Sequence, residues 1–349
     1  MDLRFFRSKK VFITGHTGFK GSWLTKILLM SGAQVTGYAL LPPKESLFNI
    51  CSFKRGIKNY IGDIRDYKRL RKAFERSRPE IVIHMAAQPL VIESYKNPAY
   101  TYDTNVMGTV NILECVRHND SVKSFLNVTT DKVYENKERT AGYKENEPLD
   151  GYDPYSNSKS CSELVTHSYK KSFFENSSIA ISTARSGNVI GGGDFSADRI
   201  IPDCIRAAVR QEDIIVRNPR SIRPYQHVLE PLFAYLLIIQ KQCENRKFAD
   251  YYNVGPDDRD CVATEKLVKL FCDLWGGGLK YKKLKTNRGF HEAGFLKLNN
   301  AKIKRVLGWY PHWNIEDAVR KTAEWTKVYY TGGDAEYCME EQIKEFMKI

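Results

Sequence analysis

The stretch Gly15-His16-Thr17-Gly18-Phe19-Lys20-Gly21 decides the fold of this chain. It follows a short apolar run, residues 10–14, and opens a segment in which Leu24, Ile27 and Leu28 recur at helical spacing. Glycines between a strand and a helix allow a tight turn and a close backbone approach to a ligand, and the helix N-terminus attracts phosphate. The pattern G-x-x-G-x-x-G therefore predicts a dinucleotide-binding loop more strongly than ordinary turns.

Short β-branched runs alternate with helical stretches through the first half of the chain. We expect strands at residues 10–14, 34–39, near 59–61, 81–85 and 124–129, which predicts an α/β fold with a Rossmann-type doubly wound parallel sheet. The NAD-binding domain should span residues 1–190, with a return segment at about 224–256. Residues 191–223 and 257–349 should form a smaller mixed α/β lobe for the substrate, ending in a short charged helix from residue 336.

The candidate cofactor-binding residues follow the strands of this sheet. Strand 2 ends Gly37-Tyr38-Ala39-Leu40-Leu41, without the Asp or Glu that normally binds the adenosine ribose. We therefore expect loosely held NAD and weaker rejection of NADP, with Lys20 adding contacts near the ribose. The full set is Gly15, Thr17, Gly18, Phe19, Lys20, Asp63, Ile64, Ala86, Ala87, Gln88, Asn105, Tyr155 and Lys159.

Tyr155 and Lys159 form a Y-x-x-x-K pair, whose spacing places both side chains on one face of a helix. An ammonium near a phenol lowers its pKa from about 10, so the tyrosine could remove a hydroxyl proton while hydride leaves the same carbon. Such pairs also occur on ordinary helices. Downstream of a dinucleotide-binding loop, the catalytic interpretation is the stronger one.

The fifth strand leads into Thr130, Asp131 and Lys132, at the sheet edge where open α/β sheets bind ligands. Thr130 could hydrogen-bond a substrate hydroxyl beside Tyr155. Asp131 and Lys132 offer an acid to protonate departing water and a base to take a proton next to a carbonyl. The alternative is that Asp131 and Lys132 are solvent-exposed loop residues without a catalytic role.

Composition narrows the classes of function. The 349 residues carry a formal charge of +13 that is spread along the chain without a nucleic-acid-binding motif, so the charge suits a diphosphate substrate better than a nucleic acid. Eight cysteines lack any C-x-x-C pair, so we expect reduced thiols and no metal site. The most apolar segment, 228–239, contains Glu230 and is too short to cross a bilayer. We expect a cytoplasmic protein that binds no membrane.

Several motifs together resemble the CDP-glucose 4,6-dehydratases of the extended short-chain dehydrogenase superfamily, over nearly the whole chain. They are residues 15–21 (GHTGFKG), 84–90 (HMAAQPL), 130–134 (TDKVY), 151–155 (GYDPY), 185–194 (RSGNVIGGGD), 223–231 (RPYQHVLEP) and 291–293 (HEA). Lys132 stands where related dTDP-glucose and GDP-mannose dehydratases typically have Glu, which favours a CDP-sugar.

The resemblance implies an NAD-dependent hydro-lyase in which Thr130, Asp131, Lys132, Tyr155 and Lys159 are catalytic. It implies substrate contacts from Gln88, Asn188, Arg199, Arg223 and His291. It also implies a homodimer, with a tetramer as the alternative, and a product used for deoxysugars of bacterial lipopolysaccharide or capsule. Three alternatives stay open: a dehydratase of another nucleotide-linked hexose or heptose, a 4-epimerase, and a non-catalytic NAD sensor on the same fold.

Overall fold

A seven-stranded, fully parallel sheet forms the centre of the larger lobe in the computed structural model, which describes residues 2–348 except 52, 54–55 and 285–293. The strand order is β11-β6-β5-β4-β1-β2-β3, so the order reverses beside β1. The strands are β1 (Lys10–Thr14), β2 (Gln34–Ala39), β3 (Ile57–Ile61), β4 (Ile81–His84), β5 (Ser124–Thr130), β6 (Ala180–Ser186) and β11 (Tyr251–Val254).

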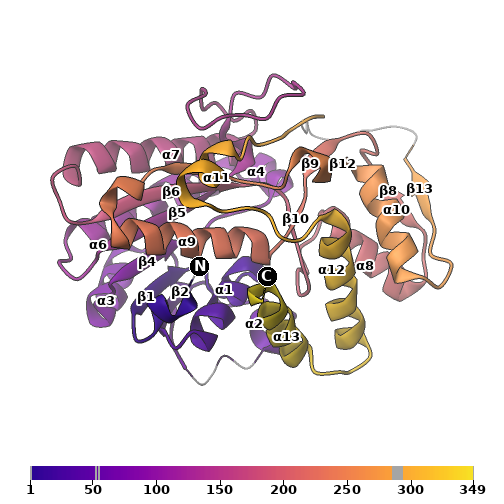
Figure 1. Cartoon of the computed structure of the whole chain (residues 1–349), viewed down its shortest axis with the longest axis horizontal. Helices are drawn as coiled ribbons and strands as arrows, with labels where there is room; N and C mark the ends of the chain where they lie inside the picture. Colours follow the sequence, from indigo (N-terminus) through magenta and orange to yellow (C-terminus); the bar gives the residue numbers. More distant parts are fainter. Residues whose placement is uncertain (1, 52, 54–55, 285–293, 349) are drawn as a thin grey trace.

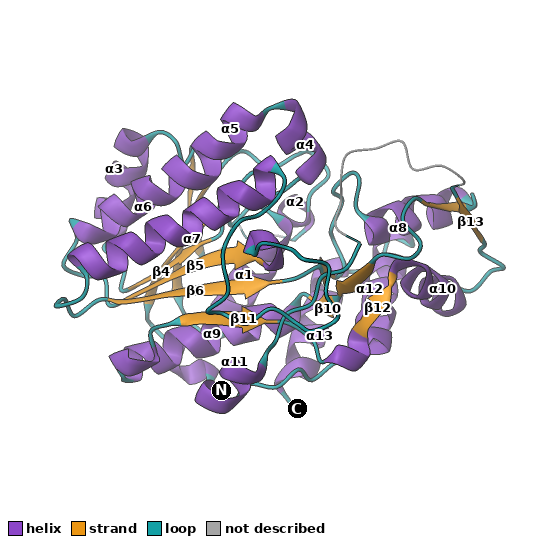
Figure 2. Ribbon diagram, turned by 90° about the horizontal axis from the view of Figure 1, so that it is seen from above, coloured by secondary structure: helices purple, strands orange, loops and turns teal. Residues whose placement is uncertain are grey.

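Helices cover both faces of the sheet, as Figure 2 shows. Alternate residues of a strand point to opposite faces, and in β1 Val11 and Ile13 belong to one core while Phe12 belongs to the other. The first core packs against α1 (Phe19–Met30), α9 (Leu229–Glu244) and α13 (Ala335–Met347). The second packs against α3 (Tyr67–Ser77), α6 (Gly108–Arg117) and α7 (Pro154–Phe173).

The smaller lobe lies beyond the carboxyl ends of the strands, at the right of Figure 1. Its core includes Ile201, Phe271 and Val319, each almost fully buried. It is built from α8 (Ile200–Arg210), the parallel pair β8 (Ile214–Val216) and β13 (Tyr281–Lys283), the antiparallel pair β9 (Ile222–Pro224) and β12 (Cys261–Ala263), α10 (Thr264–Trp275) and α12 (Ile315–Tyr330).

Short elements complete the described chain. They are β7 (Val189–Ile190), which pairs with β10 (Gln226–His227), the helices α2 (Leu47–Ile50), α4 (Val91–Lys96), α5 (Pro98–Tyr102) and α11 (Ala301–Leu307), the π-helical turn η2 (Asp103–Met107), and the 3-10 turns η1 (Leu3–Phe6), η3 (Asp131–Val133), η4 (Arg246–Phe248) and η5 (Asp258–Asp260).

All five strands expected from the sequence are present, although β4 ends one residue earlier and β5 one residue later than predicted. The predicted C-terminal helix is α13. Strand β6 was not predicted, because its sequence AISTARS contains buried polar side chains. Two of these, Thr183 and Arg185, donate hydrogen bonds to Glu163 on α7. No helix in the described residues is long and apolar enough to span a membrane.

Candidate active site

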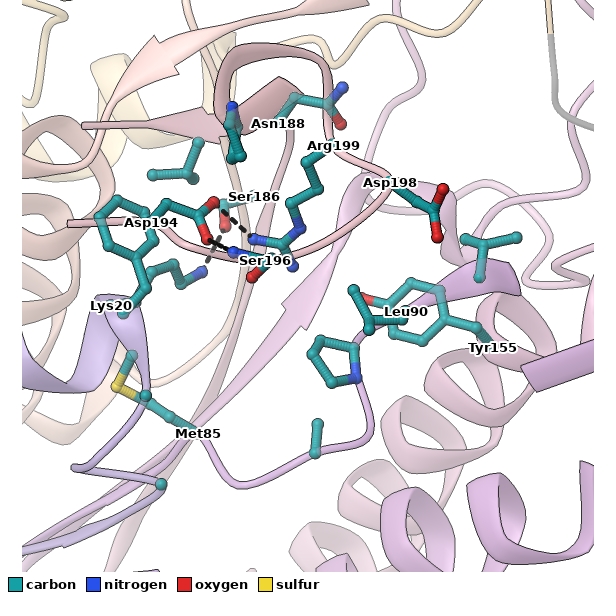
Figure 3. A pocket seen from close by; sticks show the side chains of 18 of the residues that line it. Lys20, Met85, Leu90, Tyr155, Ser186, Asn188, Asp194, Ser196, Asp198 and Arg199 are labelled. Carbon is teal, nitrogen blue, oxygen red and sulfur yellow. Dashed lines mark hydrogen bonds and ion pairs between the residues drawn. The ribbon is translucent and has the colours of Figure 1, made fainter. Parts of the chain in front are cut away.

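One cavity of about 1000 Å³ runs along the carboxyl ends of the strands and into the smaller lobe. Its wall includes the glycine-rich loop, the ends of β2 and β4, the start of α7 and the segment after β6. Figure 3 shows Met85, Leu90 and Tyr155 on one side of this space and Asn188 and Arg199 on the other. Open α/β sheets bind ligands at this position, beside the strand where the order reverses.

The glycine-rich loop is shaped by close backbone packing. Gly15 has φ 78°, and a Cβ there would lie 2.8 Å from the backbone nitrogen of Ala86. A Cβ on Gly21 would lie 2.1 Å from the carbonyl oxygen of Gly15. Gly18, by contrast, caps α1 and is exposed to the cavity. Two glycines therefore let the loop fold, and the third leaves room for a ligand at the helix N-terminus.

The end of β2 carries no carboxylate, as the sequence indicated. Leu40, which follows it, is half exposed, and Thr17 Oγ1 donates a hydrogen bond to its carbonyl oxygen. Asp63 and Ile64 line the same part of the cavity. The Asp63 carboxylate is engaged by Arg65 at 2.7 Å, and the hydrogen bonds from Arg65 lower its pKa. Asp63 therefore has a fixed partner already.

Tyr155 and Lys159 both reach the cavity from the first turns of α7. The helix begins with Pro154, and Asp153 caps it by accepting a hydrogen bond from the backbone N–H of Ser156 at 3.0 Å, so Tyr155 is held at a defined position. Burial raises the pKa of Tyr155 to about 12, against the lowering effect of a hydrogen bond with Thr130. The expected lowering of this pKa by Lys159 is therefore wrong for the protein alone.

Lys159 is held by a hydrogen bond from Nζ to the carbonyl oxygen of Val128, at 3.0 Å. Burial and, to a smaller extent, the charge of Lys20 lower the pKa of Lys159 to about 8. The sequence did not identify Glu163, one turn further along α7. Its carboxylate is buried and accepts hydrogen bonds from Thr129 and from Arg185 at 3.0 Å. The four-residue spacing of Tyr155, Lys159 and Glu163, which places all three on one helical face, could have identified Glu163 from the sequence.

Thr130 and Asp131 lie just behind the cavity wall, while Lys132 lines it. Asp131 is buried; its Oδ1 accepts a hydrogen bond from Thr130 Oγ1 at 3.0 Å, and its Oδ2 has no hydrogen-bond partner among the described residues. Burial raises the pKa of Asp131 despite the charge of Lys132. A Cβ on Gly187 would lie 3.1 Å from Asp131 Oδ2, and Gly187 lines the cavity, so this carboxyl lies beside a lining residue that has no side chain.

Asn188, Arg199 and Arg223 lie together along the arm of the cavity that enters the smaller lobe. Arg199 is partly exposed and forms an ion pair with Asp194 at 3.1 Å, whereas Arg223 on β9 is almost fully buried. Arg217 also lines this arm and was not identified from the sequence. Guanidinium groups at this position suit a diphosphate.

Two residues that were predicted to contact a ligand lie away from the cavity. Gln88 does not line the cavity: its amide donates to Leu90 and Thr101 and accepts from the Leu90 N–H, so the side chain is held by its own loop and by α5. Asn105 is also buried away from the cavity, where it hydrogen-bonds the Gln88 backbone. Both residues hold the loop that presents Ala86 and Ala87, which do line the cavity.

Lys20 does not point to the ribose end. It lines the cavity, and its amine donates to Tyr235 and Ser186 near β6. His291 lies outside the described residues. No group of three or more metal-ligating side chains occurs within the ranges that the structure describes, and the cysteines are free thiols.

Several known proteins are similar to this chain over most of its length. Residues 12–322 match the family model for GDP-mannose 4,6 dehydratase. A CDP-glucose 4,6-dehydratase of Salmonella typhimurium is 45% identical over 99% of this chain and 98% of its own length. A probable dTDP-glucose 4,6-dehydratase of Sinorhizobium fredii is 28% identical over 90% of this chain and 92% of its own.

Solved structures share the fold at lower identity. A dTDP-glucose 4,6-dehydratase of Bacillus anthracis in complex with NAD has a TM-score of 0.78 at 21% identity, covering 93% of this chain and 99% of its own. A UDP-glucose 4-epimerase of Thermotoga maritima with UDP-glucose has a TM-score of 0.81 at 23% identity, covering 92% and 99%.

Proposed function

The chain belongs to the GDP-mannose 4,6-dehydratase family, and from this premise we propose that it converts CDP-glucose to CDP-4-keto-6-deoxyglucose and water. It is an NAD-dependent enzyme of the hydro-lyase class. The observation that carries the proposal is the buried carboxyl of Asp131, whose pKa is raised by burial, and the adjacent amine of Lys132, next to Tyr155 and Lys159. A plain 4-epimerase needs the last two residues but has no use for the acid and base.

The cavity wall suits NAD. The exposed Gly18 and the N-terminus of α1 would hold the pyrophosphate, and Ala86 and Ala87 leave space for the cofactor to pass. Asp63 and Ile64 lie where the adenine would be bound. When bound, NAD supplies a hydride acceptor for C4 of the sugar and a hydride donor for C6.

Tyr155 removes the proton of the sugar O4 hydroxyl during oxidation at C4. A buried phenol resists ionisation, as its raised pKa indicates, so the phenolate needs stabilisation. A hydrogen bond with Thr130 lowers the pKa of Tyr155, and Lys159 supplies positive charge from the same helical face as Tyr155. The resulting 4-keto group makes the C5 proton acidic.

Lys132 takes the C5 proton, and Asp131 gives a proton to the C6 hydroxyl, which leaves as water. Burial raises the pKa of Asp131 and so favours the protonated form that this step requires, and its Oδ2, which has no hydrogen-bond partner in the described structure, lies beside Gly187. The two groups are consecutive in the chain, so one backbone turn, η3, positions both acid and base. C5 is then reprotonated, and bound NAD would supply the hydride that C6 receives.

We also propose that Arg199, Arg223 and Asn188 bind the diphosphate of the substrate. CDP is favoured over other nucleotides by the 45% identical relative and by Lys132. We propose a homodimer in the cytoplasm, whose product feeds deoxysugar synthesis for bacterial surface glycans. Sedimentation as a monomer at low micromolar concentration would contradict the dimer.

Offering CDP-, dTDP-, GDP- and UDP-hexoses with added NAD tests the function directly. We expect a keto-sugar from CDP-glucose in preference to the others, and turnover in heavy water should place deuterium at C5. A heptose substrate would show as turnover of a nucleotide-linked heptose alone. A 4-hydroxy product formed without loss of water would identify a 4-epimerase, and binding of NAD without turnover of any sugar would identify a sensor.

A further inference from the structure

Lys20 occupies an unusual position for a lysine. It is the second residue of α1, two positions after the exposed Gly18, and it lines the cavity. Its Nζ donates to Tyr235 Oη at 3.1 Å and to Ser186 Oγ at 3.3 Å, both uncharged hydroxyls, and Figure 3 shows it pointing toward Ser186.

The charge of Lys20 is not neutralised by a neighbouring carboxylate. Lys26, one and a half turns further along the same helix, pairs with Glu336 and with Glu340 at 3.0 Å. Among the described residues no carboxylate pairs with Lys20 in this way; Asp131 is near enough to raise its pKa but forms no ion pair with it. A buried cation that has no counter-ion carries a desolvation cost that an incoming anion removes.

The surroundings of Lys20 add positive charge. Arg199 lowers its pKa, and Lys20 in turn lowers the pKa of Lys159. The N-terminus of α1 adds a partial positive charge. Asp131 is the opposing negative group, and Tyr235 is a neutral phenol whose pKa is raised by burial. The balance around this amine favours an anion.

We propose that Lys20 binds a diphosphate oxygen of a ligand in this cavity. This inference rests on the proposed function, because that function supplies the two candidate ligands: NAD, through its pyrophosphate, and the CDP-sugar, through its diphosphate. Because β2 ends without a ribose-binding carboxylate, charge at the phosphates would replace part of the affinity that the missing group normally gives.

Proton uptake should accompany this binding. Burial lowers the pKa of the free Lys20 amine to about 7, so much of it is neutral above that pH. A phosphate favours the ammonium form and raises the pKa again. Binding should therefore take up almost no proton at about pH 6 and approach roughly one proton at about pH 8.5.

Titration calorimetry of the purified protein, in buffers of differing ionisation enthalpy, measures this uptake. NAD and CDP are titrated separately into the wild type, Lys20→Met, Lys20→Gln and the control Lys68→Met, which removes an exposed lysine from α3. Lys20→Gln keeps hydrogen-bonding capacity toward Ser186 and Tyr235, so it remains informative if Lys20→Met does not fold.

We expect Lys20→Met and Lys20→Gln to raise the Kd of one ligand by about 10- to 100-fold and to abolish its proton uptake. The ligand affected identifies the source of the phosphate, and Lys68→Met should match the wild type. An unchanged Kd for both ligands, or wild-type uptake that does not depend on Lys20, would overturn the inference. These readouts do not depend on turnover, so failure of the dehydratase assay would be a separate result.

Discussion

Replacing Asp131 with Asn should separate oxidation of the sugar from the loss of water. The amide has the shape of the carboxyl, and its Oδ1 can still accept the hydrogen bond that Thr130 Oγ1 donates at 3.0 Å. The neighbouring Oδ2 position has no hydrogen-bond partner in the described structure, so an NH2 group placed there breaks no existing contact. What Asp131→Asn removes is the carboxyl proton that the proposed acid step transfers, and burial favours that proton by raising the pKa of Asp131.

The magnitude follows from the role of one general acid. A positioned acid contributes about 10²- to 10⁴-fold, so kcat for keto-sugar formation should fall by that factor, which is roughly 3–5 kcal/mol of activation free energy. Tyr155, Thr130 and Lys159 stay in place, so oxidation at C4 should change by less than about tenfold. The C5 proton should still exchange with heavy water, because Lys132 is intact.

Single-turnover kinetics with CDP-glucose checks both parts. Absorbance of the reduced nicotinamide reports oxidation at C4, and product analysis reports dehydration. Lys132→Gln is the matched control, since it should retain oxidation but lose exchange at C5. The reasoning would be refuted if oxidation and dehydration fell together in Asp131→Asn, or if dehydration fell by less than tenfold.

Four further outcomes can be tested separately. Tyr155→Phe should lose oxidation at C4 and dehydration alike, by about 10²-fold or more in single turnover, because the base for the O4 proton is gone. Glu163→Gln should lower the free energy of unfolding by about 3 kcal/mol in denaturant titrations, since it leaves the buried Arg185 without its counter-charge. Burial raises the pKa of Glu230 to about 8, so the folded protein keeps a proton that the unfolded chain releases near pH 4.5. The stability that Glu230 contributes is therefore lost as the pH rises from about 4.5 to about 8. Glu230→Gln should have a higher Tm than the wild type at pH 8 and the same Tm at pH 5. NAD should be lost from the wild-type protein during gel filtration, because β2 ends without a carboxylate, and retention of a full complement would contradict loose binding.

The sequence alone determined the Rossmann-type architecture and the cluster at the end of β5. Glycine spacing and helical periodicity are local properties, so the loop at 15–21 and the pair Tyr155 and Lys159 could be read without coordinates. The resemblance to the dehydratases rested on motifs of the same local kind, and the 45% identical relative agrees with it.

Only the tertiary structure decided where side chains point and what burial does to their protons. Gln88 and Asn105 proved to support a loop, because residues distant in sequence supply their hydrogen bonds. The pKa of Tyr155 is raised and not lowered, since desolvation outweighs its neighbours. Lys20 points toward β6 and not toward the ribose end, because it hydrogen-bonds Tyr235, which lies 215 residues away in the chain. Such contacts depend on packing between elements, which residue spacing does not encode.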